Sequence, residues 1–355
     1  APALPRLASG PHLGMITGFD PLDDQRAAIA ADRYAEARQA GATIGRIQID
    51  WAELETGPGA YDEDALNDAF AAPELAGMNL VVLLSTLDSD GLTLPDYLVE
   101  DDALRDGLTL DAPEVRDAFL AFLDWLAPRQ VQHEVWLLSI GNEIIGTIED
   151  GLASDDQAAA FYAAAMDRWN QNVPDIGITL TFTIAAPEGI PTVFEALRSR
   201  ADIVSFNYYC LNADITVSGP SQWEARLAQM KQDAGDREIF LQELGCPVGY
   251  GPQGRPTSLG GSLDTQARFF KFFGDQFATD PQLRAATLFQ LYDWSPELAQ
   301  IFNQPLIDAG QPVAAARLEE WLATVGAVRW SDRTSRPGRE AWLGAVRKAK
   351  AAREQ

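Results

Sequence analysis

Short apolar runs of strand type alternate with helical patterns along the whole chain, and this alternation restricts the fold more than any other feature of the sequence. It is typical of a parallel sheet in which a crossover helix joins each strand to the next. Eight such runs can be counted, over residues 14–19, 44–49, 79–84, 135–140, 177–184, 203–208, 238–241 and 286–291.

Eight strands with eight crossovers close more readily into a barrel than into an open doubly wound sheet, and no Gly-rich phosphate loop follows the first run. A chain of 355 residues is long for one domain, but such barrels commonly extend to about 250 residues and beyond. We therefore expect an α/β protein, a (β/α)8 TIM barrel forming a single domain over residues 1–328.

The tail over residues 329–355 differs from the rest of the chain because it is rich in arginine and lysine. The whole chain, by contrast, carries a formal charge of −25. We expect the tail to form a short helical extension that packs on the acidic barrel. A basic docking segment for another partner is the alternative.

Local signals mark the ends of some helices and the longer connections. Ser154 is followed by Gln157, and Ser221 by Glu224, so both serines are expected to begin helices through capping boxes. Gly235 is a suitable terminator for the second of these helices. The connections over residues 85–111 and 246–263 are expected to rise over the carboxyl ends of the strands.

The net charge also narrows the choice of partner. A charge of −25 and a pI near 4.3 repel phosphates, so we expect neither nucleic acid nor an anionic membrane as a partner. No apolar run approaches the roughly 20 residues that a membrane span needs. A neutral ligand suits the chain better, and an acidic coat that keeps the protein monomeric is the simpler reading of the charge.

The first residues, Ala1-Pro-Ala-Leu-Pro5, are similar to the trimmed start of an exported protein. We expect a secreted or periplasmic protein on this basis, although the sequence leaves a cytoplasmic location open.

Polar residues follow most of the strand-like runs, where barrel enzymes carry their catalytic groups. Most carboxylates lie on solvated surfaces, so a carboxylate at the end of a buried strand needs a partner or a function. The residues that follow the strand-like runs are Asp20, Asp50, Trp51, Asp88, Asn142, Glu143, Asn207, Tyr208, Tyr209, Glu243, Tyr292, Asp293 and Trp294.

Two glutamates stand out, Glu143 after the fourth run and Glu243 after the seventh. Cleavage of a glycosidic bond needs one protonated carboxyl at the leaving oxygen and a second, ionised carboxylate. Two glutamates across a barrel mouth would meet that need. Each of them alone could equally be a helix cap or one half of an ion pair.

Gly141-Asn142-Glu143, Glu243 and the segment Arg46-Ile-Gln-Ile-Asp-Trp51 together resemble the clan A glycoside hydrolases, which are retaining (β/α)8 enzymes. The resemblance covers nearly the whole barrel. It implies that Glu143 is the acid/base, that Glu243 is the nucleophile and that Arg46 steadies the nucleophile.

The same resemblance implies the substrate-binding residues. Asn142 would bind the sugar 2-hydroxyl, Tyr209 would donate a hydrogen bond to Glu243, and Trp294 would form the floor of the −1 subsite. Asn207 stands two residues before Tyr209, where many members of the clan have a histidine, so the contacts around the sixth strand are less specified. For Trp51, sugar stacking and core packing are both open.

The two cysteines, Cys210 and Cys246, each follow a proposed site residue closely. A disulfide that braces the rim of the barrel is our hypothesis for them. The chain has only two histidines, His12 and His133, and neither ends a strand. We therefore expect no metal and no cofactor, which disfavours a metal-dependent hydrolase.

The expected substrate is a β-linked neutral glycan or oligosaccharide. The short sequence segments around Glu143 and Glu243 are most similar to those of endo-β-galactanases and β-1,3-glucanases in the clan. The sugar, the linkage and the choice between endo and exo attack stay open. A catalytically silent carbohydrate-binding barrel is the alternative, although the presence of both glutamates argues against it.

Overall fold

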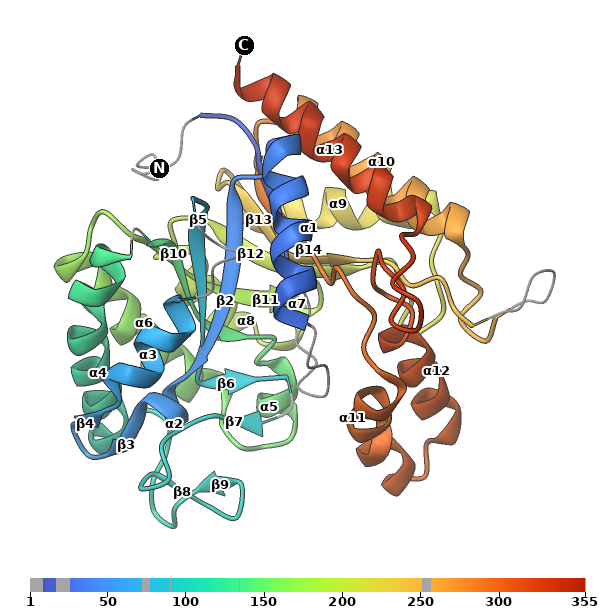
Figure 1. The fold of residues 1–355 in the computed structure, drawn as a ribbon. Helices are drawn as coiled ribbons and strands as arrows, with labels where there is room; N and C mark the ends of the chain where they lie inside the picture. The colour runs from blue at the N-terminus through green and yellow to red at the C-terminus, as the bar shows by residue number, and fades with distance from the viewer. Residues whose placement is uncertain are drawn as a thin grey trace. The chain divides into compact units, whose positions relative to one another are not determined.

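The structure is a computed structural model that describes residues 9–16, 26–71, 77–89, 91–133, 135–250 and 257–354. Its central feature is a closed parallel barrel of eight strands in the order β1-β14-β13-β12-β11-β10-β5-β2 (Figure 1). The predicted (β/α)8 barrel is therefore confirmed. The strands are β1 (His12–Met15), β2 (Ile44–Asp50), β5 (Asn79–Ser85), β10 (Val135–Asn142), β11 (Gly177–Thr183), β12 (Val204–Tyr209), β13 (Ile239–Gly245) and β14 (Leu283–Leu288).

All eight predicted strands are present, but some boundaries differ. β13 continues to Gly245, so Glu243 lies within the strand instead of after it. β14 spans Leu283–Leu288, whereas the sequence predicted residues 286–291. Residues 17–25, which include Asp20, lie outside the described part of the chain.

Burial explains why the strands read as continuous apolar runs and not as alternating patterns. Every residue of β10, β13 and β14 is buried. The strands of such a barrel are covered by helices on one face and fill the barrel with their other face, so both faces select apolar residues. β10 pairs in parallel with β5 through Leu137 opposite Val81, and with β11 through Leu137 opposite Gly177.

The crossover helices begin and end at recognisable residues. Ser154 and Gln157 form the predicted capping box at the start of α6 (Asp155–Asn172). The capping box predicted at Ser221 is wrong, because α9 (Pro220–Ala234) starts one residue earlier. Gly235 follows α9 with φ 65°, as expected of a terminator. Further helices of eight or more residues are α1 (Arg26–Ala40), α3 (Glu63–Phe70), α4 (Pro113–Gln132), α8 (Pro191–Arg198), α10 (Leu263–Thr279) and α13 (Pro337–Arg353).

The contacts divide the barrel chain into two compact units, which we describe separately. The first comprises Gly45–Asn207 and Gln232–Phe240. Here α4 packs against α6, and α6 packs against α8. An aromatic cluster holds this unit together: Trp51 lies 4.8 Å from Phe119 between ring centroids, and Phe119 lies 4.9 Å from Phe161.

The second unit comprises Ser9–Ile44, Tyr208–Lys231 and Leu241–Gln355. In it, α13 lies along α10 (Figure 1). A Cβ atom on Gly274 would lie only 2.4 Å from Cβ of Ala345, so glycine is what allows this close approach of the two helices. The fully buried Trp342 of α13 donates a hydrogen bond from Nε1 to the carbonyl of Gly14 in β1, at 3.0 Å.

The basic tail thus contains a helix, as predicted, but the helix begins only at Pro337. The residues before it form a loop that Arg336 anchors. Its guanidinium binds the carboxylate of Asp293 in a bidentate ion pair, with N–O distances of 2.5 and 2.7 Å.

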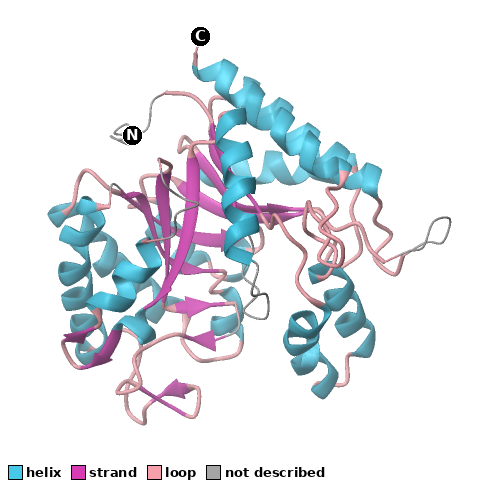
Figure 2. Ribbon diagram, in the orientation of Figure 1, coloured by secondary structure: helices cyan, strands magenta, loops and turns pink. Residues whose placement is uncertain are grey.

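The connections at the carboxyl ends of the strands carry additional small elements (Figure 2). The connection after β5 contains the hairpins β6 (Leu87–Asp88) with β7 (Gly91–Leu92) and β8 (Val99–Glu100) with β9 (Ala103–Leu104). The sequence did not predict the helical pair α11 (Pro296–Asp308) and α12 (Pro312–Leu322), which follows β14. The remaining elements are α2 (Trp51–Leu54), β3 (Glu55–Gly57), β4 (Ala60–Tyr61), α5 (Ile145–Glu149) and α7 (Ala186–Gly189). Within the described ranges, none of the helices has the length and hydropathy required to span a bilayer.

Candidate active site

Glu143 stands where β10 turns into the following loop, and its backbone is unusual. Its φ is 50°, in the left-handed region that residues other than glycine rarely adopt. The backbone N–H of Glu143 donates to the carbonyl of Thr181 in β11 at 2.9 Å, which holds the turn in place. Unfavourable backbone conformations of this type concentrate at functional sites, because the surrounding structure must impose them.

The residue before Glu143 belongs to a polar network in the first unit. Asn142 donates from Nδ2 to Oδ1 of Asp88 at 2.9 Å. Its own Oδ1 accepts from Nδ2 of Asn207 at 3.0 Å. Both asparagines are more than nine-tenths buried. The structure therefore brings together two of the predicted substrate-binding residues, Asn142 and Asn207, and joins them to Asp88.

Asp50, at the end of β2, lies close to the same network. Burial, as the largest cause, and the negative charges of Glu53 and Asp88 together raise the pKa of Asp50 to about 6, against hydrogen bonds from Gln48 and Ser85 that lower it. Oδ1 of Asp50 is buried and has no hydrogen-bond partner within the described ranges. Asp50 therefore holds its proton to a higher pH than an exposed aspartate does.

Glu243 belongs to the second unit and is only 6% exposed. The hydroxyl of Tyr209 donates a short hydrogen bond to Oε2 of Glu243, as the sequence predicted. Tyr209 is in turn held by edge-to-face contacts with Phe289 and Trp321, at centroid distances of 5.4 and 4.9 Å. These contacts fix the phenol that holds Glu243.

Gly245 makes room for this arrangement. A Cβ atom at this position would lie 2.7 Å from the carbonyl oxygen of Phe289 and 3.0 Å from Cδ1 of Tyr209. The glycine two residues after Glu243 is therefore part of what lets Tyr209 reach the carboxylate.

Three further predicted site residues have different surroundings. Arg46 is half-buried in β2 and donates to Oε1 of Gln48 at 3.0 Å, while its proposed contact with Glu243 stays a prediction. Trp294 is half-buried and packs edge-to-face on Phe302 at 4.5 Å, so its role as a subsite floor also stays a prediction.

Trp51 requires a correction. Its side chain has no exposed surface, packs on Phe119 and Phe122, and donates from Nε1 to Oε2 of Glu55 at 2.7 Å. A tryptophan enclosed in this way offers no face to a sugar ring. The structure therefore replaces the substrate-binding assignment of Trp51 with the core-packing alternative.

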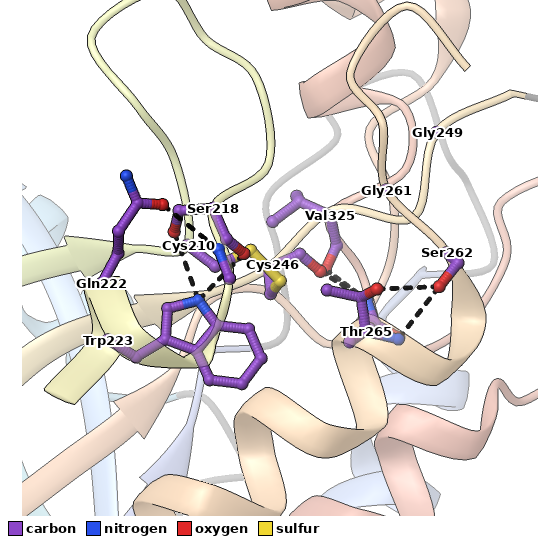
Figure 3. The surroundings of a disulfide bond; sticks show 12 residues. Cys210, Ser218, Gln222, Trp223, Cys246, Gly249, Gly261, Ser262, Thr265 and Val325 are labelled. Atoms are coloured by element: carbon purple, nitrogen blue, oxygen red, sulfur yellow. Dashed lines mark hydrogen bonds between the residues drawn. A yellow bond between two sulfur atoms is a disulfide. The ribbon is translucent and has the colours of Figure 1, made fainter. Parts of the chain in front are cut away.

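The disulfide hypothesis is confirmed, because Cys210 and Cys246 are bonded and both are fully buried (Figure 3). The two residues continue the ends of β12 and β13, where the backbone N–H of Cys210 donates to the carbonyl of Gly245 at 3.0 Å. Trp223 lies beside the bond and donates from Nε1 to the carbonyl of Ser218 at 3.1 Å.

The second unit also has a cavity of about 780 Å³, lined in part by Tyr250, Trp294 and Trp330. Asp293 and Arg336 belong to its wall. The sequence placed Asp293 among the candidate polar groups at the strand ends. Its carboxylate is instead committed to Arg336 and to the backbone N–H of Gly326 at 2.9 Å, which makes it a structural anchor of the tail.

Trp321 is a residue that the sequence analysis missed. It lies in α12, a helix that was not predicted, and its contact with Tyr209 relates it to the site. No local signal distinguishes it from any other tryptophan on a helix. As for metals, no group of three His, Cys, Asp or Glu side chains in the described part of the chain is arranged to hold an ion.

No model of a protein family matches the chain, and no curated protein is similar to it in sequence. Solved structures are similar in fold. One is a GH5_18 protein variant from Streptomyces cattleya in complex with Manb1-4GlcNAc, with 17% identity, a TM-score of 0.68, and coverage of 95% of this chain and 80% of that one.

Two others have TM-scores of 0.71. One is an exo-beta-1,4-mannosidase from Opitutaceae bacterium strain TAV5, with 14% identity and coverage of 97% of this chain and 60% of that one. The other is a GH5_18 variant from Bifidobacterium longum subsp. longum, with 13% identity and coverage of 95% of this chain and 78% of that one. These structures do not bear out the expected likeness to endo-β-galactanases and β-1,3-glucanases in particular. What they show is the fold: the chain forms a (β/α)8 barrel of the type that these glycoside hydrolase structures have.

Proposed function

We propose that this protein is a retaining glycoside hydrolase in which Glu143 is the acid/base and Glu243 is the nucleophile. The observation that carries the proposal is the placement of the two glutamates at the carboxyl ends of β10 and β13 in a closed parallel barrel. In such barrels the catalytic groups come from the carboxyl ends of several strands, and these ends all lie at the same end of the barrel.

The immediate contacts of each glutamate support its role. Tyr209 donates to Oε2 of Glu243 and so orients the carboxylate that is proposed to attack the anomeric carbon. Glu143 follows Asn142, whose amide is placed by Asp88 and Asn207. In the first step Glu143 would protonate the leaving oxygen while Glu243 forms the glycosyl ester. In the second, Glu143 would take a proton from the water that releases the sugar.

We propose a neutral β-linked substrate, with a β-mannoside as the first candidate. Two similar structures were obtained with Manb1-4GlcNAc, and a third is named an exo-beta-1,4-mannosidase. Beta-glucuronidases are also among the structures of similar fold. The formal charge of −25 disfavours a glucuronide, because it repels an anionic sugar at long range.

The test is the release of nitrophenol from a panel of aryl β-glycosides that includes the mannoside, the glucoside, the galactoside, the N-acetylglucosaminide and the glucuronide. Glu243→Ala should lose turnover of every substrate. Glu143→Gln should lose most on substrates with poor leaving groups, since activated aryl groups need little protonation. Equal losses on good and poor leaving groups would contradict the role of Glu143.

The second candidate function is a catalytically silent barrel that binds a glycan, favoured by the aromatic side chains in the 780 Å³ cavity. Wild-type protein that binds oligosaccharides but hydrolyses no glycoside or polysaccharide would support it. Export of the protein and its monomeric state stay predictions from the sequence.

A further inference from the structure

The network beside Glu143 has a direction. Asn207 donates to Asn142, and Asn142 donates to Asp88. Each asparagine amide has one donor end and one acceptor end, so reversing either amide would break the chain of hydrogen bonds. Something must therefore determine which way the amides face.

Asp88 is suited to set this direction because an ionised carboxylate accepts hydrogen bonds and cannot donate. Only the NH2 end of Asn142 can bind it. Once this end faces Asp88, the Oδ1 atom of Asn142 faces Asn207 and requires a donor there, and Nδ2 of Asn207 supplies it.

The far end of the network does not set the direction. Oδ1 of Asn207 is buried and has no hydrogen-bond partner in the described part of the chain. A donor on that atom would have fixed the Asn207 amide independently. Its absence among the described residues leaves the carboxylate of Asp88 as the group that orients both amides.

Asp88 is itself held firmly. Its Oδ2 accepts from the hydroxyl of Ser85 at 2.8 Å, its Oδ1 accepts from the backbone N–H of Ser89 at 2.7 Å, and its carbonyl accepts from the hydroxyl of Thr147 at 2.6 Å. It also pairs with Gly91 in the short β6–β7 hairpin. An acceptor fixed by this many contacts can impose its orientation on a neighbouring amide.

We propose that Asp88 is a positioning residue that holds the amide of Asn142 with its NH2 group toward the Asp88 carboxylate. One N–H of this group then binds Asp88, and the second N–H is presented to a hydroxyl of the sugar. This inference rests on the proposed function, in which Asn142 contacts the 2-hydroxyl. Asp88 acts through Asn142 and touches neither the reacting carbon nor the leaving group.

The test compares Asp88→Ala and Asp88→Asn on two substrates, the best aryl β-glycoside of the panel and its 2-deoxy counterpart. Asp88→Ala removes the acceptor and frees the amide of Asn142. We expect a 10- to 100-fold loss of kcat/KM on the parent glycoside, in the range of one charge-assisted hydrogen bond, and less than about a threefold loss on the 2-deoxy substrate. Asp88→Asn keeps an oxygen able to accept from Asn142 but gains an NH2 end that can donate, so it no longer fixes one direction and should recover the activity only in part.

Two controls accompany these variants. Asp150→Ala removes an exposed aspartate of the same unit and should leave both rates unchanged. In an Asn142→Ala background, Asp88→Ala should cost little more, because the two changes remove the same contact. If Asp88→Ala does not fold, Asp88→Ser removes the same reach to Asn142 and replaces it in the comparison.

Equal losses on the parent and the 2-deoxy substrate would overturn the inference, since they would indicate a purely structural role for Asp88. Full activity of Asp88→Ala would overturn it as well. Failure of the proposed function gives a different result, in which the wild-type protein hydrolyses no glycoside at all.

Discussion

Breaking the Cys210–Cys246 bond should lower the free energy of unfolding by about 4 kcal/mol. The two cysteines are 36 positions apart in the sequence. In the chain-entropy treatment, closing a loop of this length removes about 13 cal/mol/K from the unfolded state, or about 4 kcal/mol at 25 °C. With about 2.1 cal/mol/K of unfolding entropy per residue over 355 residues, this loss corresponds to a fall in Tm of about 5 °C.

The assay is urea unfolding, followed by the fluorescence of the nine tryptophans, on oxidised wild type, Cys246→Ala and Cys210→Ala/Cys246→Ala. Thiol titration of the denatured, unreduced wild type should find no free thiol. The single and double variants break the same bond but remove different amounts of side chain. If loop entropy dominates, both should lose nearly the same free energy.

Two results would refute this reasoning. Unfolding midpoints that are unchanged in both variants would show that the bond does not constrain the unfolded chain. A loss in the double variant that is twice the loss in the single variant would show that packing of the buried sulfurs, and not loop closure, carries the effect.

Three further predictions follow from individual contacts. Tyr209→Phe removes the hydroxyl that donates to Glu243, so kcat/KM on an aryl glycoside should fall roughly 10- to 100-fold while Tm stays nearly constant. A clear fall in Tm together with the loss of kcat/KM would contradict this reasoning. Trp342→Ala empties a fully buried site and breaks the hydrogen bond to Gly14, so urea unfolding should show a loss of about 3–5 kcal/mol. Burial raises the pKa of Asp50 from 3.8 to about 6, so the folded protein retains a proton that the unfolded chain has lost, and stability should fall as the pH rises through this window. Asp50→Asn should therefore match wild type near pH 4 and exceed it at pH 7 by about 1–2 kcal/mol, after allowance for partial exposure; parallel pH profiles of the two proteins would refute this.

The local pattern of the sequence was sufficient for the barrel. Apolar runs such as residues 135–140 and helical signals such as the Ser154 capping box depend on neighbours along the chain, and they appear in the structure as β10 and the start of α6. The two glutamates could be placed for the same reason, because a residue that directly follows or ends a strand has a position that the strand determines.

Contacts between distant segments were harder to predict. Trp51 could face either the core or a ligand, and only its packing on Phe119, far along the chain, decided for the core. Asp293 was a plausible functional carboxylate until Arg336 took both of its oxygens. The α11–α12 pair and its Trp321 had no local signal, because their relation to the site passes through Tyr209.

The sequence by itself determined the kind of sheet, the order of its strands and the positions of the candidate glutamates, because hydrophobic periodicity and strand ends are local properties. The tertiary structure alone decided which partners the polar groups have. That choice of partners depends on burial and on hydrogen bonds between residues as far apart as Asp88 and Asn142, or Tyr209 and Glu243, and no pattern of neighbouring residues records it.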